Sequence, residues 1–446
     1  MSTLQTVHHK IGNYRWTICS LVFFATTVNY LDRTVISYLR PYLATSFHWN
    51  PVEEIANYAD IELAFKLSYA IGFLFAGRVI DKLGTKIGYA LATFLWSLAA
   101  ICHALASGTL GFSIARVFLG LTEAGNFPAA IKTTAEWFPK KERALATGIF
   151  NSGSNVGAII VPFTIPQIAD SFGWQWAFIL TGAIGFLWLI LWFVFYEIPS
   201  KQKRLSAEEL AHINSDLDEK QSQETLEQAP KISWAKLLTF RQTWAFVLGK
   251  FLTDPIWWFY IFWLPDFLRK EYHLDKDSLI WPSAIPLIIA SLGSVFGGWL
   301  PMKLINNNWL VFRARKTSML IYALCVIPIV FAQYLGSMNM WLAVSVIGMA
   351  MAAHQAWSAN IFTTVSDMFP KNSTASVTGI GSLFGGLGGV LLTFLVQKRM
   401  FIYYENIQQI NTAYFIMFLI CGAAYLSAWL IMHVLVPRMK KVEFNN

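Results

Sequence analysis

The chain has 446 residues, of which 55% are hydrophobic and only 13% are charged, with a formal net charge of +8. Ordinary soluble domains carry roughly 25% charged residues, so this composition excludes a soluble domain and indicates a protein of the lipid bilayer. The basic excess does not indicate a nucleic-acid partner, because the basic residues lie in short connections between apolar segments.

Apolar segments of about 20 residues follow one another along almost the whole chain. A helix of that length crosses ~30 Å of hydrocarbon at ~1.5 Å per residue. The first fifteen residues are only weakly basic and precede a long segment without a small-residue cleavage site, which indicates a retained first helix. We predict twelve membrane-spanning helices, near residues 16–38, 56–79, 87–106, 110–131, 144–168, 174–196, 243–267, 280–304, 318–336, 340–362, 376–397 and 413–436.

Lys and Arg are concentrated in alternate connections between these segments. The positive-inside bias assigns basic connections to the cytoplasm, which predicts that both termini are cytoplasmic. Basic residues crowd the connections at 78–86, 132–143 and 303–316, whereas those at 107–109, 169–173 and 337–339 contain none.

One long polar stretch, residues 197–241, divides the chain into halves of six segments each, 1–196 and 242–446. Within it, Ser206 to Glu209 matches a capping box and predicts a short surface helix. A shift of 231 residues aligns "TAEWFPKKERALATGI" with "TVSDMFPKNSTASVTGI" in the second half and carries Glu123 onto His354. The duplication predicts two pseudo-symmetric six-helix bundles with a site between them at mid-membrane.

The sequence "GRVIDKLGTK" at residues 77–86 follows the pattern G-x-x-x-D-[RK]-x-G-x-[RK]. It resembles the loop between the second and third helices of the major facilitator superfamily. Together with "NYLDR", "ARVFLGLTEAGNFPAAIKTTAEWFPKKERA" and "HQAW", it resembles the anion:cation symporters, closest to bacterial hexuronate transporters. The resemblance implies an all-α integral membrane protein of the bacterial inner membrane. It implies a gating role for the loop residues Gly77, Arg78, Asp81, Lys82 and Gly84.

Ionisable residues inside the predicted spans are the main functional signal, because a charge at the bilayer centre costs roughly 2.5–3.5 kcal/mol on insertion scales. The planar fork of Arg33 suits bidentate binding of a carboxylate. We therefore hypothesise that Arg33 anchors an anionic sugar acid, and the resemblance supports this role. The alternative is a permanent ion pair with an acid on a neighbouring helix.

Asp32 and Glu123 are the candidate proton carriers. Adjacent helical residues point about 100° apart, so Asp32 and Arg33 have separate roles. An inside-negative potential opposes anion entry by ~2.3 kcal/mol per charge per 100 mV, and a co-transported proton removes that cost. The alternative for each acid is a static ion pair or a hydrogen bond between packed helices.

Other polar residues in the first half are candidate substrate ligands. Lys66 lies four residues after Glu62, so it either forms an intrahelical pair or supplies a second cation to the sugar acid. Tyr30 and Tyr69 are candidate hydroxyl donors to the sugar, although tyrosine is also common at membrane interfaces. Asn151 and Asn155 share one helix face and either bind sugar hydroxyls or join helices.

The second half contributes a further set of candidates. Pro255 and Pro265 predict a hinge in the seventh segment, where Trp257 and Trp258 are candidates for stacking on a sugar. Asp254 lies four residues after Lys250, which favours a structural or gating pair. We interpret two adjacent residues of the tenth segment, His354 and Gln355, as having a substrate or proton role. The alternative for His354 is a hydrogen-bonded core residue.

The sequence thus predicts proton-coupled import of a sugar-acid anion, in the first place a hexuronate. Alternatives are a symporter of another organic anion, such as an aldonate or aldarate, a sodium-driven symporter, and a receptor that binds without transport. An enzyme is not expected, because there is no Walker loop, G-x-S-x-G elbow or zinc-like histidine cluster. We expect a monomer that uses no metal, no cofactor beyond the coupling proton, and no nucleic acid. The four cysteines, Cys19, Cys102, Cys325 and Cys421, are interpreted as packing residues.

Overall fold

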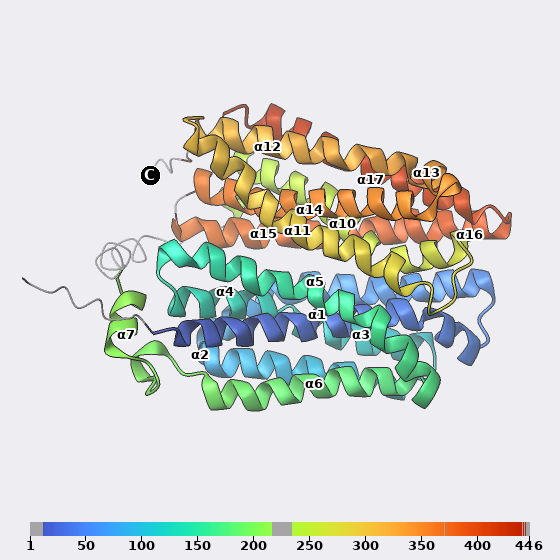
Figure 1. The fold of residues 1–446 in the computed structure, drawn as a ribbon, viewed down its shortest axis with the longest axis horizontal. Coiled ribbons are helices and arrows are strands. Elements are labelled where there is room, and N and C mark those ends of the chain that lie inside the picture. The colour runs from blue at the N-terminus through green and yellow to red at the C-terminus, as the bar shows by residue number, and fades with distance from the viewer. Residues whose placement is uncertain (1–11, 216–233, 370, 439, 441, 443–446) are drawn as a thin grey trace, which may run out of the picture.

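The computed structural model describes residues 12–215, 234–369, 371–438, 440 and 442 (Figure 1). Within its helices, the side chains of residues 78, 81, 140, 141, 143–145, 295, 366 and 371–376 lie outside the description. Over the described ranges the chain is helical and contains no β-strand. This confirms the predicted all-α architecture.

The helices follow the predicted segments closely. The first part of the chain contains α1 (Tyr14–Ser46), α2 (Pro51–Cys102), α3 (Thr109–Glu123), α4 (Asn126–Trp137), α5 (Lys140–Phe172), α6 (Trp174–Phe195) and α7 (Ala207–Ile213). The second part contains α9 (Trp234–Leu237), α10 (Arg241–Glu271), α11 (Ile280–Asn306), α12 (Val311–Val326), α13 (Ala332–Met338), α14 (Met340–Met368), α15 (Lys371–Leu391), α16 (Arg399–Asn406) and α17 (Ile410–Leu435).

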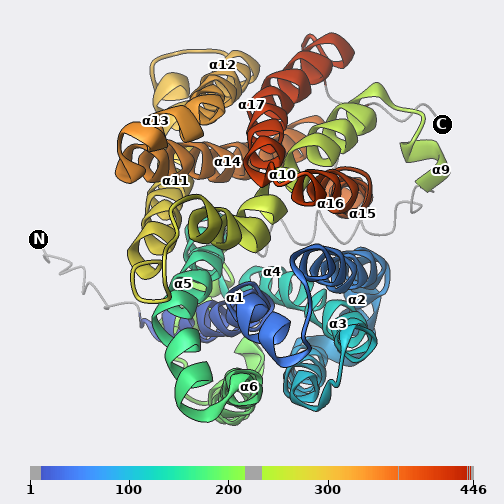
Figure 2. The ribbon, with the colours of Figure 1, turned by 90° about the vertical axis from the view of Figure 1, so that its right-hand side faces the viewer.

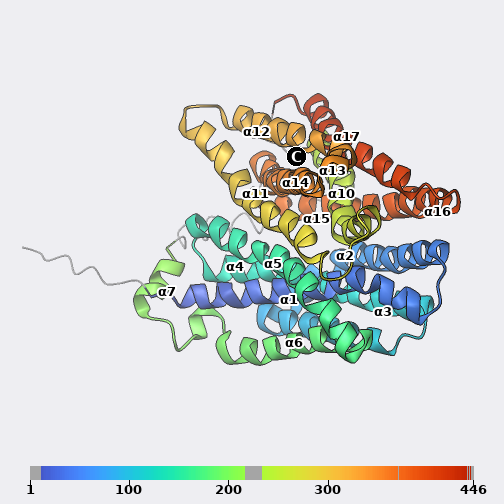
Figure 3. The same ribbon diagram turned by 45° about the vertical axis from the view of Figure 1, so that its right-hand side comes forward.

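Figure 2 shows the helices as two groups side by side, with α1 to α6 in one and α10 to α17 in the other. We call the interface between the groups the seam. At the seam α2 contacts α15 and α16, α5 contacts α11, and α1 contacts α10 (Figure 3). Helix α1 begins and α17 ends at the end of the molecule where α7 lies, whereas α16 marks the opposite end (Figure 1).

Apolar character is uneven among the helices. In the described part of the chain, eight helical segments are long and apolar enough to cross a membrane by length and composition alone. The predicted first, second, fourth and seventh spans are not among these eight. These four carry Asp32 and Arg33, Lys66, Glu123, and Lys250 with Asp254. Polar and charged residues are therefore concentrated in a few helices, all of which contribute to the seam or to the pairs described below.

Several spans are locally irregular. The long helix α2 consists of two helices joined at Gly84, whose φ of +75° is a left-handed conformation that favours glycine. The fourth span is interrupted between α3 and α4 at Ala124 and Gly125. The eleventh contains a π-helical segment, η4 (Leu392–Lys398), between α15 and α16. Such segments occur frequently at functional sites.

Glycines allow α1 and α5 to approach closely. A Cβ atom on Gly153 would lie 2.6 Å from the carbonyl oxygen of Phe23, and one on Gly157 would lie 2.3 Å from that of Thr27. Both distances are shorter than van der Waals contact, so a larger residue would force the helices apart. This small-residue packing holds α1, which carries Arg33, firmly within its group.

Helix α7 is fastened to the first group by charged side chains. Its cap is the predicted Ser206, whose side chain accepts from the Glu209 amide. The Glu209 carboxylate, however, does not complete a capping box and instead accepts from the backbone N–H groups of Tyr14 and Arg15 at the start of α1. Glu142 of α5 pairs with Arg15 and His212, at 2.9 Å each.

Replacing Glu142 by glutamine should lower the melting temperature at pH 7 by roughly 1–3 °C. Partial burial raises the pKa of Glu142, but hydrogen bonds from Arg15 and His212 outweigh it, so the pKa is lowered. The stabilisation is therefore complete above the unfolded pKa and is lost as the pH falls through the folded pKa. Melting curves of purified protein should show the wild-type advantage at pH 7 and its disappearance at low pH. The exposed Asp277 offers a control for the loss of one carboxylate, and Asp277→Asn should melt like the wild type at pH 7.

Candidate functional site

Arg33 lies at the centre of the candidate site and is 5% exposed. Its Nε donates to Oε2 of Glu123 on α3 at 3.0 Å, and its Nη2 lies 2.9 Å from the same oxygen. Nη2 also donates to Oδ1 of Asn29, one turn earlier on α1, at 3.2 Å. The residue predicted to hold an anion is thus paired with the residue predicted to carry a proton.

Two tyrosine rings flank the Arg33 guanidinium. Its Cζ lies 4.5 Å from the ring centroids of both Tyr30 and Tyr69, within the range of cation–π attraction. The Tyr69 ring in turn contacts Trp258 of α10 at 5.7 Å. The guanidinium plane is therefore positioned by aromatic groups that extend to the opposite side of the seam.

Asp32 points away from Arg33, as the helix geometry predicts. Its side chain is 2% exposed, and its polar neighbour is Thr181 of α6. Neither carboxyl oxygen has a hydrogen-bond partner in acceptable geometry among the described residues. The two acids thus differ in their surroundings, since Glu123 is paired with a guanidinium and Asp32 lies beside a threonine hydroxyl.

Arg116 of α3 is a buried cation that our sequence analysis did not select. It is 1% exposed, and its Nη1 donates to the carbonyl oxygen of Arg33 at 3.2 Å. Arg116 and Glu123 are seven residues apart, so they lie two turns apart on one helix face. This spacing within the segment "ARVFLGLTE" is the sequence signal that identifies Arg116 as a candidate.

Lys66 forms the intrahelical pair with Glu62 that was one of its two predicted roles. Its Nζ also donates to the Thr393 hydroxyl of η4 at 2.7 Å, and thus crosses the seam. Trp263 of α10 donates its indole N–H to Glu62 at 2.5 Å. The role of Lys66 as a substrate ligand stays a prediction.

Asn155 and Gln355 meet across the seam. The Gln355 amide nitrogen donates to Oδ1 of Asn155 at 3.1 Å, joining α14 to α5. Asn151 lies one turn earlier on α5 and is half-buried. Two of the predicted amide ligands are therefore brought together from opposite groups.

Trp257 and His354 lie inside the second group. Their rings stack at 4.8 Å with an interplanar angle of 9°, and Nδ1 of His354 is hydrogen-bonded to the Tyr425 hydroxyl. Lys250 and Asp254 form the predicted i, i+4 pair at 2.8 Å. Gly385 of α15 packs directly against the Asp254 carboxylate. These four candidates make their described contacts within the second group.

The predicted gating loop surrounds the turn at Gly84. Gly77 has open space where a Cβ would be, and the Lys82 side chain is exposed. The side chains of Arg78 and Asp81 lie outside the described residues. The gating role of the loop therefore stays a prediction. The positive φ at position 84 explains why that residue is a glycine.

Ion pairs close the seam at the α16 end. Arg40, which is 1% exposed, lies 2.9 Å from both Glu54 and Asp266. Arg269 lies 3.1 Å from Glu54. We call the four pairs that cross the seam here the end seal: Arg40–Asp266, Glu54–Arg269, Asp60–Lys398 and Asp170–Lys276.

The end seal was missed by sequence analysis because its charges lie near the predicted ends of spans, where charge is unremarkable. Helix α1 continues to Ser46 through Pro41, well beyond the predicted end at residue 38. Arg40 is consequently buried. Where both partners are described, the hydrogen bonds and ion pairs that cross the seam all lie between the level of Asn155 and the α16 end.

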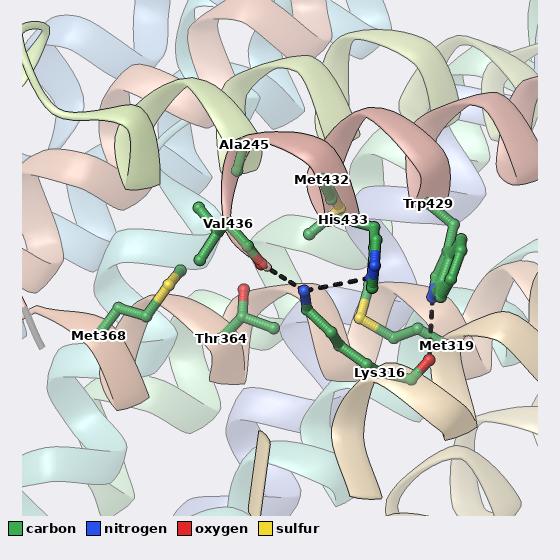
Figure 4. Close-up of a pocket in the computed structure, with 9 residues that line it drawn as sticks. All are labelled: Ala245, Lys316, Met319, Thr364, Met368, Trp429, Met432, His433 and Val436. Atoms are coloured by element: carbon green, nitrogen blue, oxygen red, sulfur yellow. Dashed lines mark hydrogen bonds between the residues drawn. The ribbon is translucent and has the colours of Figure 1, made fainter. Parts of the chain in front are cut away.

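Two small hollows have different surroundings. One lies in the seam beside Thr34 and Tyr38 of α1, with Tyr260 of α10 and Ser283 of α11 on the opposite side. The other lies among α10, α12, α14 and α17, within the second group (Figure 4). There Lys316 donates to the carbonyl oxygens of Val436 and Pro437 and caps the end of α17.

No group of three or more His, Cys, Asp or Glu side chains in the described part of the chain is arranged to hold a metal ion. The arrangement at Arg33 instead suits an organic anion. A guanidinium with a carboxylate partner, aromatic walls and the amide of Asn29 beside it can bind a carboxylate and hydroxyl groups.

The chain matches the family model described as Major Facilitator Superfamily over residues 22–393. It is 32% identical over 388 residues to the hexuronate transporter of Escherichia coli (strain K12), which covers 87% of this chain and 88% of that protein. It is 36% identical over 293 residues to the galacturonate transporter of Dickeya chrysanthemi, which covers 66% and 83%. A solved proton:xylose symporter has a similar fold, with a TM-score of 0.73 and 15% identity, covering 96% of this chain and 97% of that one.

Proposed function

The chain belongs to the Major Facilitator Superfamily, and from this premise we propose that it imports a sugar-acid anion, in the first place a hexuronate, together with protons. The family and the relatives make it a membrane transporter and not an enzyme. The substrate class is supported by the names of the hexuronate and galacturonate transporters that it resembles. We propose that it works as a monomer without a cofactor.

The observation that carries this proposal is the buried Arg33–Glu123 pair. Its net charge is zero, so a monoanionic substrate binds Arg33 favourably only if the Glu123 charge is removed at the same time. A proton on Glu123 removes that charge and releases the guanidinium for the substrate carboxylate. The arginine exchanges one carboxylate partner for another, and the net charge of Arg33 with its carboxylate partner stays zero. Binding of the substrate is thereby coupled to binding of the proton.

Asp32 supports a second proton. An ionised Asp32 would be a buried charge without a hydrogen-bond partner among the described residues, and such a charge is costly. Protonation removes the cost in the closed arrangement, and exposure to water restores ionisation. With two protons per monoanion the transported charge is positive, so an inside-negative potential of 100 mV would contribute ~2.3 kcal/mol to uptake.

We propose that the α7 end faces the cytoplasm and the α16 end faces outward. The basic connections at 78–86, 132–143 and 303–316 support this orientation. In this orientation the end seal is the outer closure of the seam. Outward opening then requires the end seal to separate, and the Arg33 site is reached from alternate sides.

Cross-linking the end seal should stop transport. Asp170→Cys and Lys276→Cys place two thiols at partly exposed positions on opposite sides of the seam. In a background without the four native cysteines, a reducible bifunctional thiol reagent should abolish uptake, because the outer opening is blocked. Reductant should restore it. The single variant Asp170→Cys, treated identically, is the control, and undiminished uptake by the cross-linked protein would contradict the role of the end seal.

The function is tested by uptake of labelled galacturonate and glucuronate into proteoliposomes. An acidic exterior in sodium-free buffer should drive accumulation above equilibrium, and a protonophore should abolish it. Protein-free liposomes provide the background. Accumulation that requires sodium would contradict proton coupling, whereas binding without accumulation would indicate a receptor.

A further inference from the structure

A second buried charge cluster lies in the seam, apart from Arg33 and Glu123. Lys66 and Glu62 of α2 form an ion pair whose side chains are each 1% exposed. Both residues also contact the opposite group, Lys66 through the Thr393 hydroxyl and Glu62 through the Trp263 indole. The cluster therefore faces the partner group and does not merely stabilise α2.

The cluster shares an aromatic wall with the Arg33 site. Arg33 Cζ lies 5.3 Å from the Phe65 ring, and that ring contacts Trp258 at 6.0 Å. Lys66 Nζ lies 5.3 Å from the same Trp258 ring. Arg33 and Lys66 thus present two charged centres to one group of rings, an arrangement suited to a ligand with two polar ends.

Packing alone does not account for this pair. Replacing a buried ion pair by well-packed apolar residues is often neutral or stabilising, because both charges must be desolvated. The partner segment η4 is π-helical, a geometry frequent at functional sites. One turn beyond Thr393, both polar atoms of the Gln397 side chain are buried and have no hydrogen-bond partner among the described residues. This part of the seam therefore contains more hydrogen-bond donors and acceptors than its own contacts satisfy.

We propose that Glu62, Lys66 and Thr393 bind the hydroxyl groups at the end of the sugar acid remote from its carboxylate, and that Glu62 excludes substrates with a second carboxylate at that end. A hydroxyl both donates and accepts, so it matches an ammonium donor beside a carboxylate acceptor. A carboxylate only accepts and would meet Glu62 as a like charge, which is costly in a desolvated site. The inference rests on the proposed function and narrows it to monocarboxylic sugar acids, such as hexuronates, over aldarates.

The test is competition for labelled galacturonate uptake by unlabelled galacturonate and by galactarate. In the wild type, galactarate should compete much more weakly than galacturonate. Glu62→Gln removes the charge but keeps an oxygen acceptor for Trp263, so it should reduce this preference at least about tenfold, equivalent to ~1.4 kcal/mol. Asp60→Asn, which removes a carboxylate from the same helix at the end seal, should leave the ratio unchanged.

The outcomes separate this inference from the proposed function. If the wild type transports no sugar acid, the proposed function fails. If Glu62→Gln transports galacturonate with an unchanged preference over galactarate, the inference fails and the proposed function stands. If Glu62→Gln does not fold because Lys66 loses its partner, the neutral double variant Glu62→Gln with Lys66→Gln is tested in the same competition assay. It should show the same loss of preference, and retention of the preference would overturn the inference.

Discussion

Replacing Arg33 by alanine should weaken galacturonate binding roughly 30-fold or more, because removing one partner of a buried hydrogen-bonded charge pair costs ~2–5 kcal/mol. The variant loses the guanidinium that would bind the substrate carboxylate and leaves Glu123 buried without its cation. Isothermal titration of purified protein measures this loss directly. Uptake by proteoliposomes should fall in parallel.

Arg33→Lys separates charge from shape. Lysine keeps the positive charge but cannot reproduce the fork that contacts Glu123 and Asn29, so its affinity should lie between those of wild type and Arg33→Ala. Arg313 of α12, whose side chain is exposed, provides the control for loss of an arginine. If Arg33→Ala melts normally and binds galacturonate within about threefold of wild type, Arg33 is not the substrate anchor.

Glu123→Gln should uncouple substrate movement from the proton gradient. Glutamine cannot exchange a proton and resembles the protonated acid, so Arg33 remains available to the substrate. Exchange of internal for external galacturonate should therefore continue. Net accumulation should fall by about tenfold for each unit of pH gradient and each coupled proton lost.

Glu136 offers a matched control for this variant. It lies on α4, just beyond the predicted span that carries Glu123, and it accepts hydrogen bonds from the hydroxyls of Thr85 and Tyr196 at the α7 end instead of pairing with an arginine. Glu136→Gln should keep gradient-driven accumulation. Full accumulation by Glu123→Gln would show that its carboxylate does not carry the coupled proton.

Asp32→Asn should lose the contribution of the second proton to accumulation while retaining exchange.

The helical architecture was predictable because length and hydropathy determine which segments cross a bilayer. Local winding was not. Two examples are the break between α3 and α4 and the π-helical segment η4. Both depend on how neighbouring helices satisfy the backbone hydrogen-bonding groups, and the sequence of one segment does not reveal its neighbours. The extension of α1 through Pro41 also exceeded the predicted span, which is why Arg40 was overlooked.

The candidate site was partly predictable because ionisable residues are expensive in lipid and therefore conspicuous. Arg33 and Glu123 were selected for that reason. Their pairing was one of two alternatives, since the sequence does not determine which helices face each other. The contact between Asn155 and Gln355 joins residues 200 positions apart, so only the packing of the two groups reveals it. Thr393 was missed because a threonine in an apolar span is common.

The central claim is that the carboxylate of Glu123 yields Arg33 to the substrate by accepting a proton. Simultaneous recording of external pH and labelled galacturonate in weakly buffered proteoliposomes tests it most directly. Addition of galacturonate outside should make the exterior more alkaline in step with uptake, and Glu123→Gln should reduce this alkalinisation without stopping exchange. Galacturonate entry with no change in external pH, or with the same change in Glu123→Gln, would contradict the account.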